Sequence, residues 1–292
     1  MDDHTGIMKN SEIKDPLFRE AVEAIDSGDI TVLKDLLAKH PNLIQDRLDY
    51  PIEGYFKNPY LLWFVADNPI RIDKLPSNIV EITQLLVEAV KRKASGGLQE
   101  QLDYTMGLVA TGRIPKECGV QLQMIDLLID AGAKPGNGIG ALAHGNIDAA
   151  AHLIEHGGKL TLTAAVCLER MDDVVRLAPA ASQEELLLAL TAAGFYGKWR
   201  MVSFLLNMGV NPNGFPENDS GFHSHATPLH QAVCSGSLYA VKLLVEAGAD
   251  TDVKDRTYQG TPLGWAAHMQ TDEGHDDDKN KFKEIEAYLS NF

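Results

Sequence analysis

The sequence predicts an all-α fold, a solenoid of stacked antiparallel helix pairs. The first observation behind this prediction is a motif, Thr-Pro-Leu, that occurs at residues 227–229 and again at 261–263. The two copies lie 34 residues apart, which is the length of one supersecondary unit. The other two observations are apolar residues at helical spacing and glycines that recur where helices would end. We therefore expect an array of small modules, an architecture that commonly serves binding.

The best-preserved module, residues 227–255, predicts a helix, a tight turn, a second helix and a projecting loop. Pro228 fits the first turn of a helix, where its missing N–H loses no hydrogen bond, and Thr227 can cap the free amides. Gly236 ends this helix because glycine tolerates the left-handed conformation of a C-cap. Apolar residues then follow at helical spacing until Gly248, and a polar, turn-prone stretch completes the module.

This module resembles the ankyrin repeat. Its opening, TPLHQA at residues 227–232, matches the T-P-L-H-x-A signature of that family, and LLVEAGAD at residues 243–250 matches its close. The resemblance implies that the whole chain is an ankyrin-repeat solenoid, with a divergent register outside its last third. Because a single repeat is too small to hold its own core, Leu205 and Leu243 are expected to pack between neighbouring repeats.

Eight candidate repeats can be placed when Gly236 is used as a reference position and paired apolar residues are sought eight and nine positions later. The reference residues are Gly28, Ser77, Gly119, Gly145, Arg170, Gly197 and Gly236, and a final helix carries Phe282, Ile285 and Leu289. The predicted organisation is a polar N-terminal segment, 1–15, and one domain, 16–292, with repeat cores near 16–40, 59–90, 102–134, 138–158, 161–179, 184–210, 226–255 and 260–292.

The intervals between reference residues predict where loops project. Gly28 and Ser77 lie 49 residues apart, whereas Gly145 and Arg170 lie 25 apart. A helix pair with tight turns needs about 25 residues, so the middle repeats are expected to be short and the longer loops to lie at both ends. The predicted insertions are 47–58, 67–76, 211–225 and 271–280.

Composition and charge narrow the class of partner. The chain has 292 residues, of which 45% are hydrophobic, and 26 basic against 41 acidic residues give a net charge of −15. This charge repels nucleic acid and anionic membranes. It would speed association with a basic protein surface, and the alternative is that it serves solubility alone. No run approaches the roughly 18 apolar residues of a membrane span, and residues 1–16 contain no apolar signal core. We expect a cytoplasmic, monomeric protein that contacts neither nucleic acid nor membrane.

The sequence offers little for catalysis. It contains no G-x-S-x-G elbow, no phosphate-binding G-x-x-x-x-G-K and no H-E-x-x-H, so we expect no enzyme activity, no cofactor and no bound metal. The alternative is a metal-dependent enzyme or metal-binding protein that uses the histidines at 223–230 and the acidic run at 272–278. Against it, the resemblance implies that His230, the fourth residue of T-P-L-H, is structural.

Candidate partner-binding residues follow from the resemblance. In ankyrin repeats the two positions before the reference residue face a concave groove, and the loop tips project beside it. The corresponding residues are His144, Phe195, Tyr196, Cys234, Ser235, His268 and Met269 in the groove, and Arg256 and Tyr258 at a loop tip. The adjacent aromatic pair suggests an interface anchor, because such side chains offer large contact area at low entropic cost. Alternatively the pair packs against the 211–225 insertion, which carries Phe215 and Phe222.

The function predicted from these observations is non-catalytic binding of a partner protein through the concave groove and the loop tips. An acidic binder of this kind would act as an inhibitor, as an immunity-type protein that masks a basic enzyme, or as a scaffold. Salt dependence of the association would favour masking over scaffolding.

Overall fold

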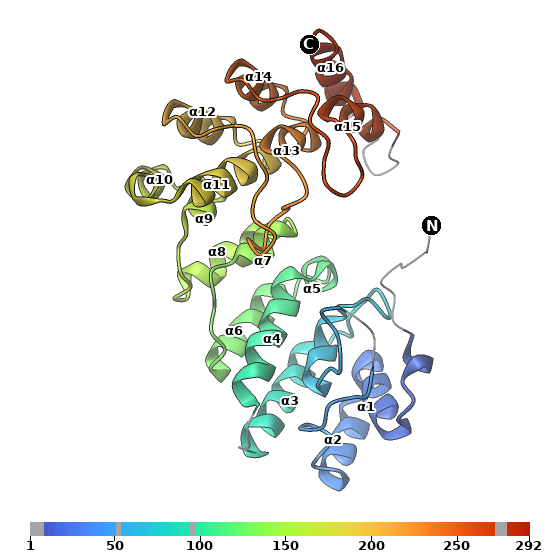
Figure 1. Ribbon diagram of the computed structural model, residues 1–292. Coiled ribbons are helices and arrows are strands. Elements are labelled where there is room, and N and C mark those ends of the chain that lie inside the picture. The colour runs from blue at the N-terminus through green and yellow to red at the C-terminus, as the bar shows by residue number, and fades with distance from the viewer. Residues whose placement is uncertain (1–8, 51–53, 94–96, 272–278) are drawn as a thin grey trace. The chain divides into compact units, whose positions relative to one another are not determined.

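The computed structural model describes residues 9–50, 54–93, 97–271 and 279–292, and their regular structure is helical (Figure 1). An isolated β-bridge joins Arg47 and Tyr60, and no strand is formed within these ranges. The all-α prediction is therefore confirmed. The chain forms two compact units, Met1–Lys159 and Leu160–Phe292.

The first unit stacks its helices in two layers. Its elements are η1 (Asn10–Glu12), α1 (Pro16–Ser27), α2 (Ile30–Lys39), η2 (Leu61–Ala66), α3 (Ile79–Lys93), α4 (Leu98–Thr111), α5 (Arg113–Glu117), α6 (Gln121–Ala131), α7 (Ile139–Ala143) and α8 (Ile147–Glu155). One layer is formed by α1, η2, α4 and α7, each packed on the next, and the other by α2, α3, α6 and α8. Each layer thus takes one helix from every helix pair, as expected of stacked repeats.

The second unit repeats this arrangement more regularly. Its elements are α9 (Leu162–Cys167), α10 (Met171–Leu177), η3 (Ala178–Ala180), α11 (Gln183–Phe195), α12 (Trp199–Asn207), α13 (Pro228–Cys234), α14 (Leu238–Glu246), α15 (Pro262–Met269) and α16 (Lys279–Leu289). The inner layer is α9, α11, α13 and α15, and α12, α14 and α16 pack in series as the outer layer. The helices overlap the predicted repeat cores, while the division into eight repeats stays a prediction.

At the five glycine reference positions, a left-handed residue joins the two helices of a pair. Gly236 has φ +70°, and α14 begins two residues later. One prediction at this position is wrong: in the fifth repeat the left-handed residue is Glu169, with φ +54°, and not Arg170. Since α10 begins at Met171, the register of this repeat shifts by one residue, and its apolar pair becomes Leu177 and Ala178.

The core of the second unit lies between its two layers. Leu205 and Leu244 are fully buried there. Leu243 is only partly buried and packs against this core. The core position predicted for Leu243 is therefore occupied by the next residue, Leu244. In α16, Phe282, Ile285 and Leu289 are buried against the preceding repeat. This helix therefore closes the apolar core at the C-terminal end of the stack.

Candidate interaction surface

A row of aromatic rings crosses the second unit from α11 to α15. We define the aromatic row as Phe195, Phe222, His223, His225, Trp265 and Tyr258. The Phe195 ring lies 4.5 Å from that of His223, whose ring lies 5.9 Å from that of His225. The His225 ring stacks on Trp265 at 6.0 Å and meets the Tyr258 ring edge-on at 6.3 Å. The insertion at 211–225 therefore connects the loop tip with the end of α11.

The loop tip, residues 255–260, is held by a single buried carboxylate. Asp255 Oδ1 accepts hydrogen bonds from the backbone N–H groups of Thr257 (2.9 Å) and Tyr258 (2.6 Å). Its Oδ2 accepts from the N–H of Gly260 (2.8 Å) and from the indole Nε1 of Trp265 (3.0 Å). Burial by itself would raise the pKa of Asp255, but these four donors outweigh it and lower the pKa to about 2. The ionised carboxylate thus fixes the backbone that carries Tyr258.

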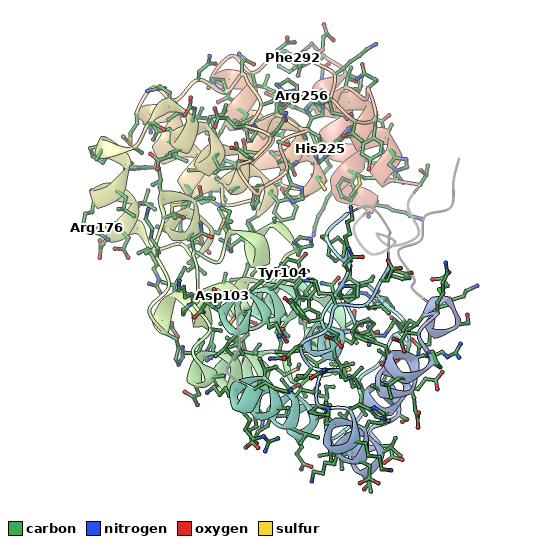
Figure 2. The ribbon with its side chains drawn as sticks, turned by 60° about the horizontal axis from the view of Figure 1, so that its bottom comes forward. Asp103, Tyr104, Arg176, His225, Arg256 and Phe292 are labelled. Atoms are coloured by element: carbon green, nitrogen blue, oxygen red, sulfur yellow. The ribbon has the colours of Figure 1, made fainter. Side chains whose placement is uncertain are left out.

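Fixing this loop leaves its two predicted contact residues on the outside. Tyr258 is 76% exposed, the largest fraction among the large hydrophobic residues that the structure describes. Arg256 is also exposed; its backbone N–H donates to the carbonyl of His225 at 2.8 Å, and its guanidinium lies 4.3 Å from the centre of the Phe215 ring (Figure 2). The loop tip therefore offers an aromatic and a cationic side chain from a preorganised backbone.

An open, largely apolar pocket of about 440 Å³ lies beside the loop tip. Its lining consists of Cys234, Tyr258, Gly260, Gly264, Trp265, His268 and Met269. Four of these residues were predicted to bind a partner. His268 is exposed at the rim, while Met269 is buried and contributes to the floor rather than projecting into the groove.

Beside the pocket, the second copy of the T-P-L motif lacks the histidine of the first copy. In the first copy the buried His230 donates through Nε2 to the carbonyl of Gly260 at 3.0 Å, which ties one repeat to the loop of the next. In the second copy the corresponding residue is Gly264, which is exposed. Without a side chain at this position, the surface of α15 beside Trp265 stays open.

The predicted anchor pair, Phe195 and Tyr196, is half-buried. The Phe195 ring packs edge-on against the buried Phe222 at 5.5 Å and against Tyr196 at 4.9 Å. This is the packing against the 211–225 insertion that the sequence offered as the alternative. Burial also raises the pKa of the Tyr196 hydroxyl above its ordinary value. Phe195 therefore supports the aromatic row, and the more exposed positions lie toward Tyr258.

The two remaining predicted groove residues lie in different surroundings. Ser235 is part of the turn between α13 and α14: its hydroxyl donates to the carbonyl of Ala232 at 2.8 Å and accepts from the N–H of Ser237 at 3.3 Å. His144 belongs to the first unit and is exposed, with its Nδ1 donating to the carbonyl of Gly140 at 2.8 Å. Ser235 is thus engaged in the turn, and His144 marks a separate surface.

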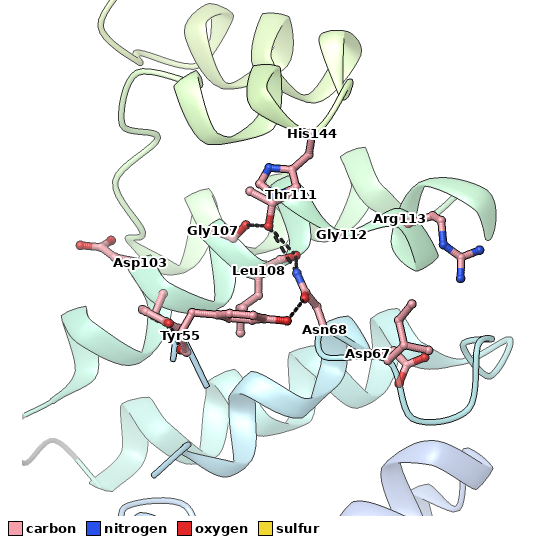
Figure 3. A pocket seen from close by; sticks show the side chains of 12 residues that line it. Tyr55, Asp67, Asn68, Asp103, Gly107, Leu108, Thr111, Gly112, Arg113 and His144 are labelled. Atoms are coloured by element: carbon pink, nitrogen blue, oxygen red, sulfur yellow. Dashed lines mark hydrogen bonds between the residues drawn. The ribbon is translucent and has the colours of Figure 1, made fainter. Parts of the chain in front are cut away.

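That separate surface is a pocket of about 650 Å³ in the first unit (Figure 3). Helix α4 contributes Tyr104, Leu108 and Thr111 to its lining, and His144 also lines it. The hydroxyl of Tyr55 donates to Asn68 Oδ1 at 2.8 Å, and Asn68 Nδ2 donates to the carbonyl of Leu108 at 3.2 Å. These hydrogen bonds link the insertion to α4, so the polar groups of this pocket support the fold of the unit.

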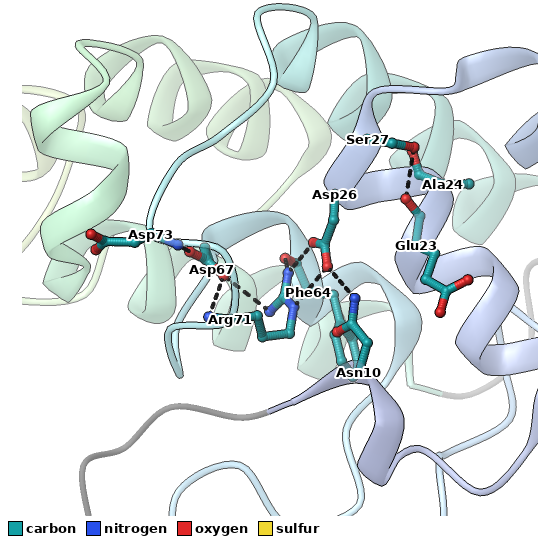
Figure 4. Close-up of polar contacts among 9 residues, drawn as sticks. All are labelled: Asn10, Glu23, Ala24, Asp26, Ser27, Phe64, Asp67, Arg71 and Asp73. Atoms are coloured by element: carbon teal, nitrogen blue, oxygen red, sulfur yellow. Dashed lines mark hydrogen bonds and ion pairs between the residues drawn. The ribbon is translucent and has the colours of Figure 1, made fainter.

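The insertion at 67–76 is anchored by a buried ion network (Figure 4). The Arg71 side chain is 1% exposed; its Nη2 lies 2.7 Å from Asp26 Oδ1 on α1 and 2.7 Å from the carbonyl of Phe64. Asp67 accepts from the backbone N–H of Arg71 at 2.8 Å, and its side chain is fully buried. Burial raises the pKa of Asp67, and the neighbouring Arg71 cation opposes this rise. The network fastens the insertion to the first helix pair.

The histidines of the alternative metal-binding hypothesis make other contacts. Both ring nitrogens of His230 are engaged, Nε2 with the Gly260 carbonyl and Nδ1 with Thr227 Oγ1 at 2.8 Å. The rings of His223 and His225 belong to the aromatic row. The acidic run at 272–278 lies outside the described residues. Within the part of the chain that the structure describes, the one cluster with the spacing of a metal site involves other histidines, considered below.

Three residues that organise this surface were not predicted for it. Asp255 was counted as part of a polar loop, His225 belonged to the alternative metal-site hypothesis, and Trp265 was not singled out. A local signal exists only for Asp255, because an Asp before a short polar loop commonly accepts hydrogen bonds from the following amides. The roles of Trp265 and His225 depend on contacts between repeats.

Stacked helix pairs with a preorganised loop tip beside an open aromatic surface define a repeat protein of the binding class. Comparison with known families then places the chain: a model described as ankyrin repeats, in three copies, matches residues 117–255 and 191–275, which together cover more than half of the chain. The chain belongs to the ankyrin repeat proteins, which are protein–protein interaction modules and generally not enzymes. No curated protein matches it. No helix in the described residues combines the length and the apolar character needed to cross a membrane.

Proposed function

We propose that this chain binds a partner protein non-catalytically through the second unit, at the surface formed by the loop tip, the 440 Å³ pocket and the exposed end of the aromatic row. The observation that supports this proposal most directly is Tyr258, 76% exposed on a backbone that Asp255 fixes. A rigid, exposed aromatic residue beside an apolar pocket is the arrangement found at interface hot spots. The partner is expected to insert an apolar side chain between Tyr258 and Trp265.

Preorganisation is the energetic reason to favour this surface. Ordering a flexible loop at an interface costs about 0.5–1.5 kcal/mol for each immobilised side chain. The hydrogen bonds to Asp255 make most of this loop rigid before the partner arrives. In the first unit, by contrast, the polar groups around the 650 Å³ pocket are engaged with one another. The second unit therefore has more exposed side chains on a rigid backbone that a partner can contact.

The charge of the chain supports a basic partner. A net charge of −15 raises the rate of encounter with a cationic surface and suppresses binding to nucleic acid. An inhibitor or immunity-type protein that masks a basic protein fits this charge better than a scaffold, whose partners need not share a sign. We propose the masking role, and association that weakens steeply between about 0.05 and 0.5 M salt would support it.

The test uses two substitutions that act on the surface without opening the core. Gly264→Leu places a side chain over the pocket; a Cβ there makes only an ordinary contact, 3.4 Å from Thr261 Oγ1, and leucine is a better helix former than glycine by about 1 kcal/mol. Tyr258→Ala removes the exposed anchor. The matched control is Tyr239→Ala, because Tyr239 is 56% exposed on α14 in the outer layer.

In affinity capture from a lysate of the native organism, wild type and Tyr239→Ala should retain one common partner. Gly264→Leu and Tyr258→Ala should lose it, with thermal unfolding unchanged or, for Gly264→Leu, shifted upward. Retention of the partner by both surface variants would refute the proposed site. If Tyr239→Ala loses the partner as well, the interface includes the outer layer, and the proposed site is wrong or incomplete.

A further inference from the structure

A cluster of two histidines and one aspartate lies between α6 and α8, in the layer of the first unit formed by α2, α3, α6 and α8. His152 and His156 are four residues apart, so they share one face at the end of α8. Asp126 projects from α6, which packs on α8. The Asp126 Oδ1 atom lies 2.5 Å from His152 Nε2 and 3.8 Å from His156 Nε2.

Repeat stacking explains why these residues meet. Asp126 follows the reference residue Gly119 by seven positions, and His152 follows Gly145 by seven positions. Equivalent positions of neighbouring repeats lie side by side in a stack. His156 joins them because it lies one helical turn beyond His152. The cluster is therefore a direct product of the repeat register, and a one-residue slip in either repeat would separate it.

The orientation of His156 is that of a metal ligand. Its Nδ1 lies 2.8 Å from the carbonyl oxygen of His152. A carbonyl oxygen only accepts hydrogen bonds, so Nδ1 carries the proton, and in the neutral ring Nε2 keeps its lone pair directed toward Asp126. Metal-bound histidines typically donate their second nitrogen in this way, which fixes the tautomer and the ring orientation.

The distances suit a small tetrahedral cation after a modest adjustment. The three ligand atoms all lie within 4.8 Å of one another. Ligands at about 2.0–2.1 Å from a tetrahedral zinc ion are about 3.3 Å apart. Asp126 would have to withdraw from His152 by less than about 1 Å, and its side chain is 49% exposed and unconstrained by the core.

Electrostatics and access also favour a cation. The cluster lies beside the last turn of α8, at the negative end of the helix dipole. The side chains of Asp126, His152 and His156 are 49%, 19% and 43% exposed, so an ion can enter from solvent. Two imidazoles with one carboxylate select a transition metal over calcium or magnesium.

We propose that Asp126, His152 and His156 form a binding site for one divalent transition cation of the zinc type, with a fourth position open to water or to a side chain of another molecule. This site lies apart from the proposed partner surface, on the other compact unit. It is also distinct from the metal site that the sequence suggested at 223–230. A cation bridging α6 and α8 would hold two consecutive repeats together.

The experiment is zinc titration of the full chain by calorimetry, together with the visible absorption of the cobalt-loaded protein. Wild type should bind one zinc ion, and cobalt should give the intense bands of a tetrahedral site. His156→Ala and Asp126→Asn should each weaken zinc binding by at least about 10-fold, since even loss of an outer hydrogen-bond partner costs about 10–100-fold. Both residues are half-exposed, so the variants are expected to fold.

Two matched controls make the result specific. His144→Ala removes an exposed histidine of the same unit, and the pair His223→Ala with His225→Ala removes the alternative ligands in the second unit. Both controls should bind zinc as wild type does. No binding by wild type, or binding that persists in His156→Ala, or binding lost in the His223/His225 variant but not in Asp126→Asn, would overturn the proposal.

Discussion

The two units differ in what their insertions leave exposed. In the first unit, Phe56 of the 47–58 insertion lies in the core, and Arg71 fastens the 67–76 insertion with buried charges. In the second unit, the insertion at 211–225 also buries Phe222, but its His225 ring lies against the loop tip, where Tyr258 is exposed. The comparison teaches that an irregular repeat is not by itself a functional signal. An insertion marks a binding surface only where its side chains remain exposed.

The substitution expected to lower the unfolding free energy most is one that removes Arg71, the centre of the buried ion network of the first unit. Arg71→Met leaves Asp26 and Asp67 without their buried cation, and the unfolding free energy should fall by about 3–5 kcal/mol. Arg113→Met is the control, because Arg113 pairs with Asp73 and Glu117 at the surface, where solvent screens the charges, so its loss should change stability far less. Urea denaturation measures both. An Arg71 variant as stable as the Arg113 variant would contradict the anchoring role.

A second substitution tests the packing of the second unit. Leu205 is fully buried between the helix layers, so Leu205→Ala should cost about 2–5 kcal/mol. Leu243→Ala should cost clearly less, because Leu243 is only partly buried at the edge of the same core. The two melting temperatures check this order. Equal losses would mean that the core register seen here is wrong.

The smallest expected effect is the pH dependence contributed by His230. Burial lowers the pKa of His230 below its ordinary value of about 6.5, so the folded protein keeps the ring neutral where the unfolded chain takes up a proton. This contribution to stability is fully present above about pH 6.5 and is lost as the pH falls toward the folded pKa. Asp255, with a pKa of about 2, stays ionised throughout this window.

The variant that isolates this effect is His230→Gln, whose amide can still donate to the Gly260 carbonyl. Urea midpoints at pH 7.5 and 5.5 should drop more in wild type than in His230→Gln. Identical pH dependence in the two proteins would show that His230 does not contribute.

The parts of the fold that were predicted correctly are those specified by residues close together in the sequence. The starts of α13 and α15 were predicted because Thr and Pro act within one turn, and Gly236 predicted the start of α14 because its left-handed conformation is local. The fifth repeat was misplaced by one residue because no glycine marked it, and Glu169 adopts the left-handed conformation instead. Local rules cannot choose among residues that all disfavour that conformation.

The candidate sites were also predicted only where local sequence signals place their residues, because contacts between distant residues cannot be read from such signals. Tyr258 and Arg256 were placed by the motif, but the rigidity of their loop depends on Trp265 donating to Asp255 across ten residues. The metal cluster was missed although the His152–His156 spacing is visible in the sequence. Its third ligand, Asp126, becomes apparent only when equivalent positions of consecutive repeats are compared.

If the partner binds at the loop tip of the second unit, crosslinking from that position will capture it. A photo-crosslinking phenylalanine analogue is placed, in separate variants, at three exposed tyrosines: Tyr258 at the loop tip, Tyr55 beside the first-unit pocket, and Tyr239 on the outer layer. These side chains are 76%, 57% and 56% exposed, respectively. After illumination in a lysate of the native organism, we expect one partner to be crosslinked from position 258 and not from 55 or 239. Crosslinking of that partner from 55 or 239, with none from 258, would contradict the account.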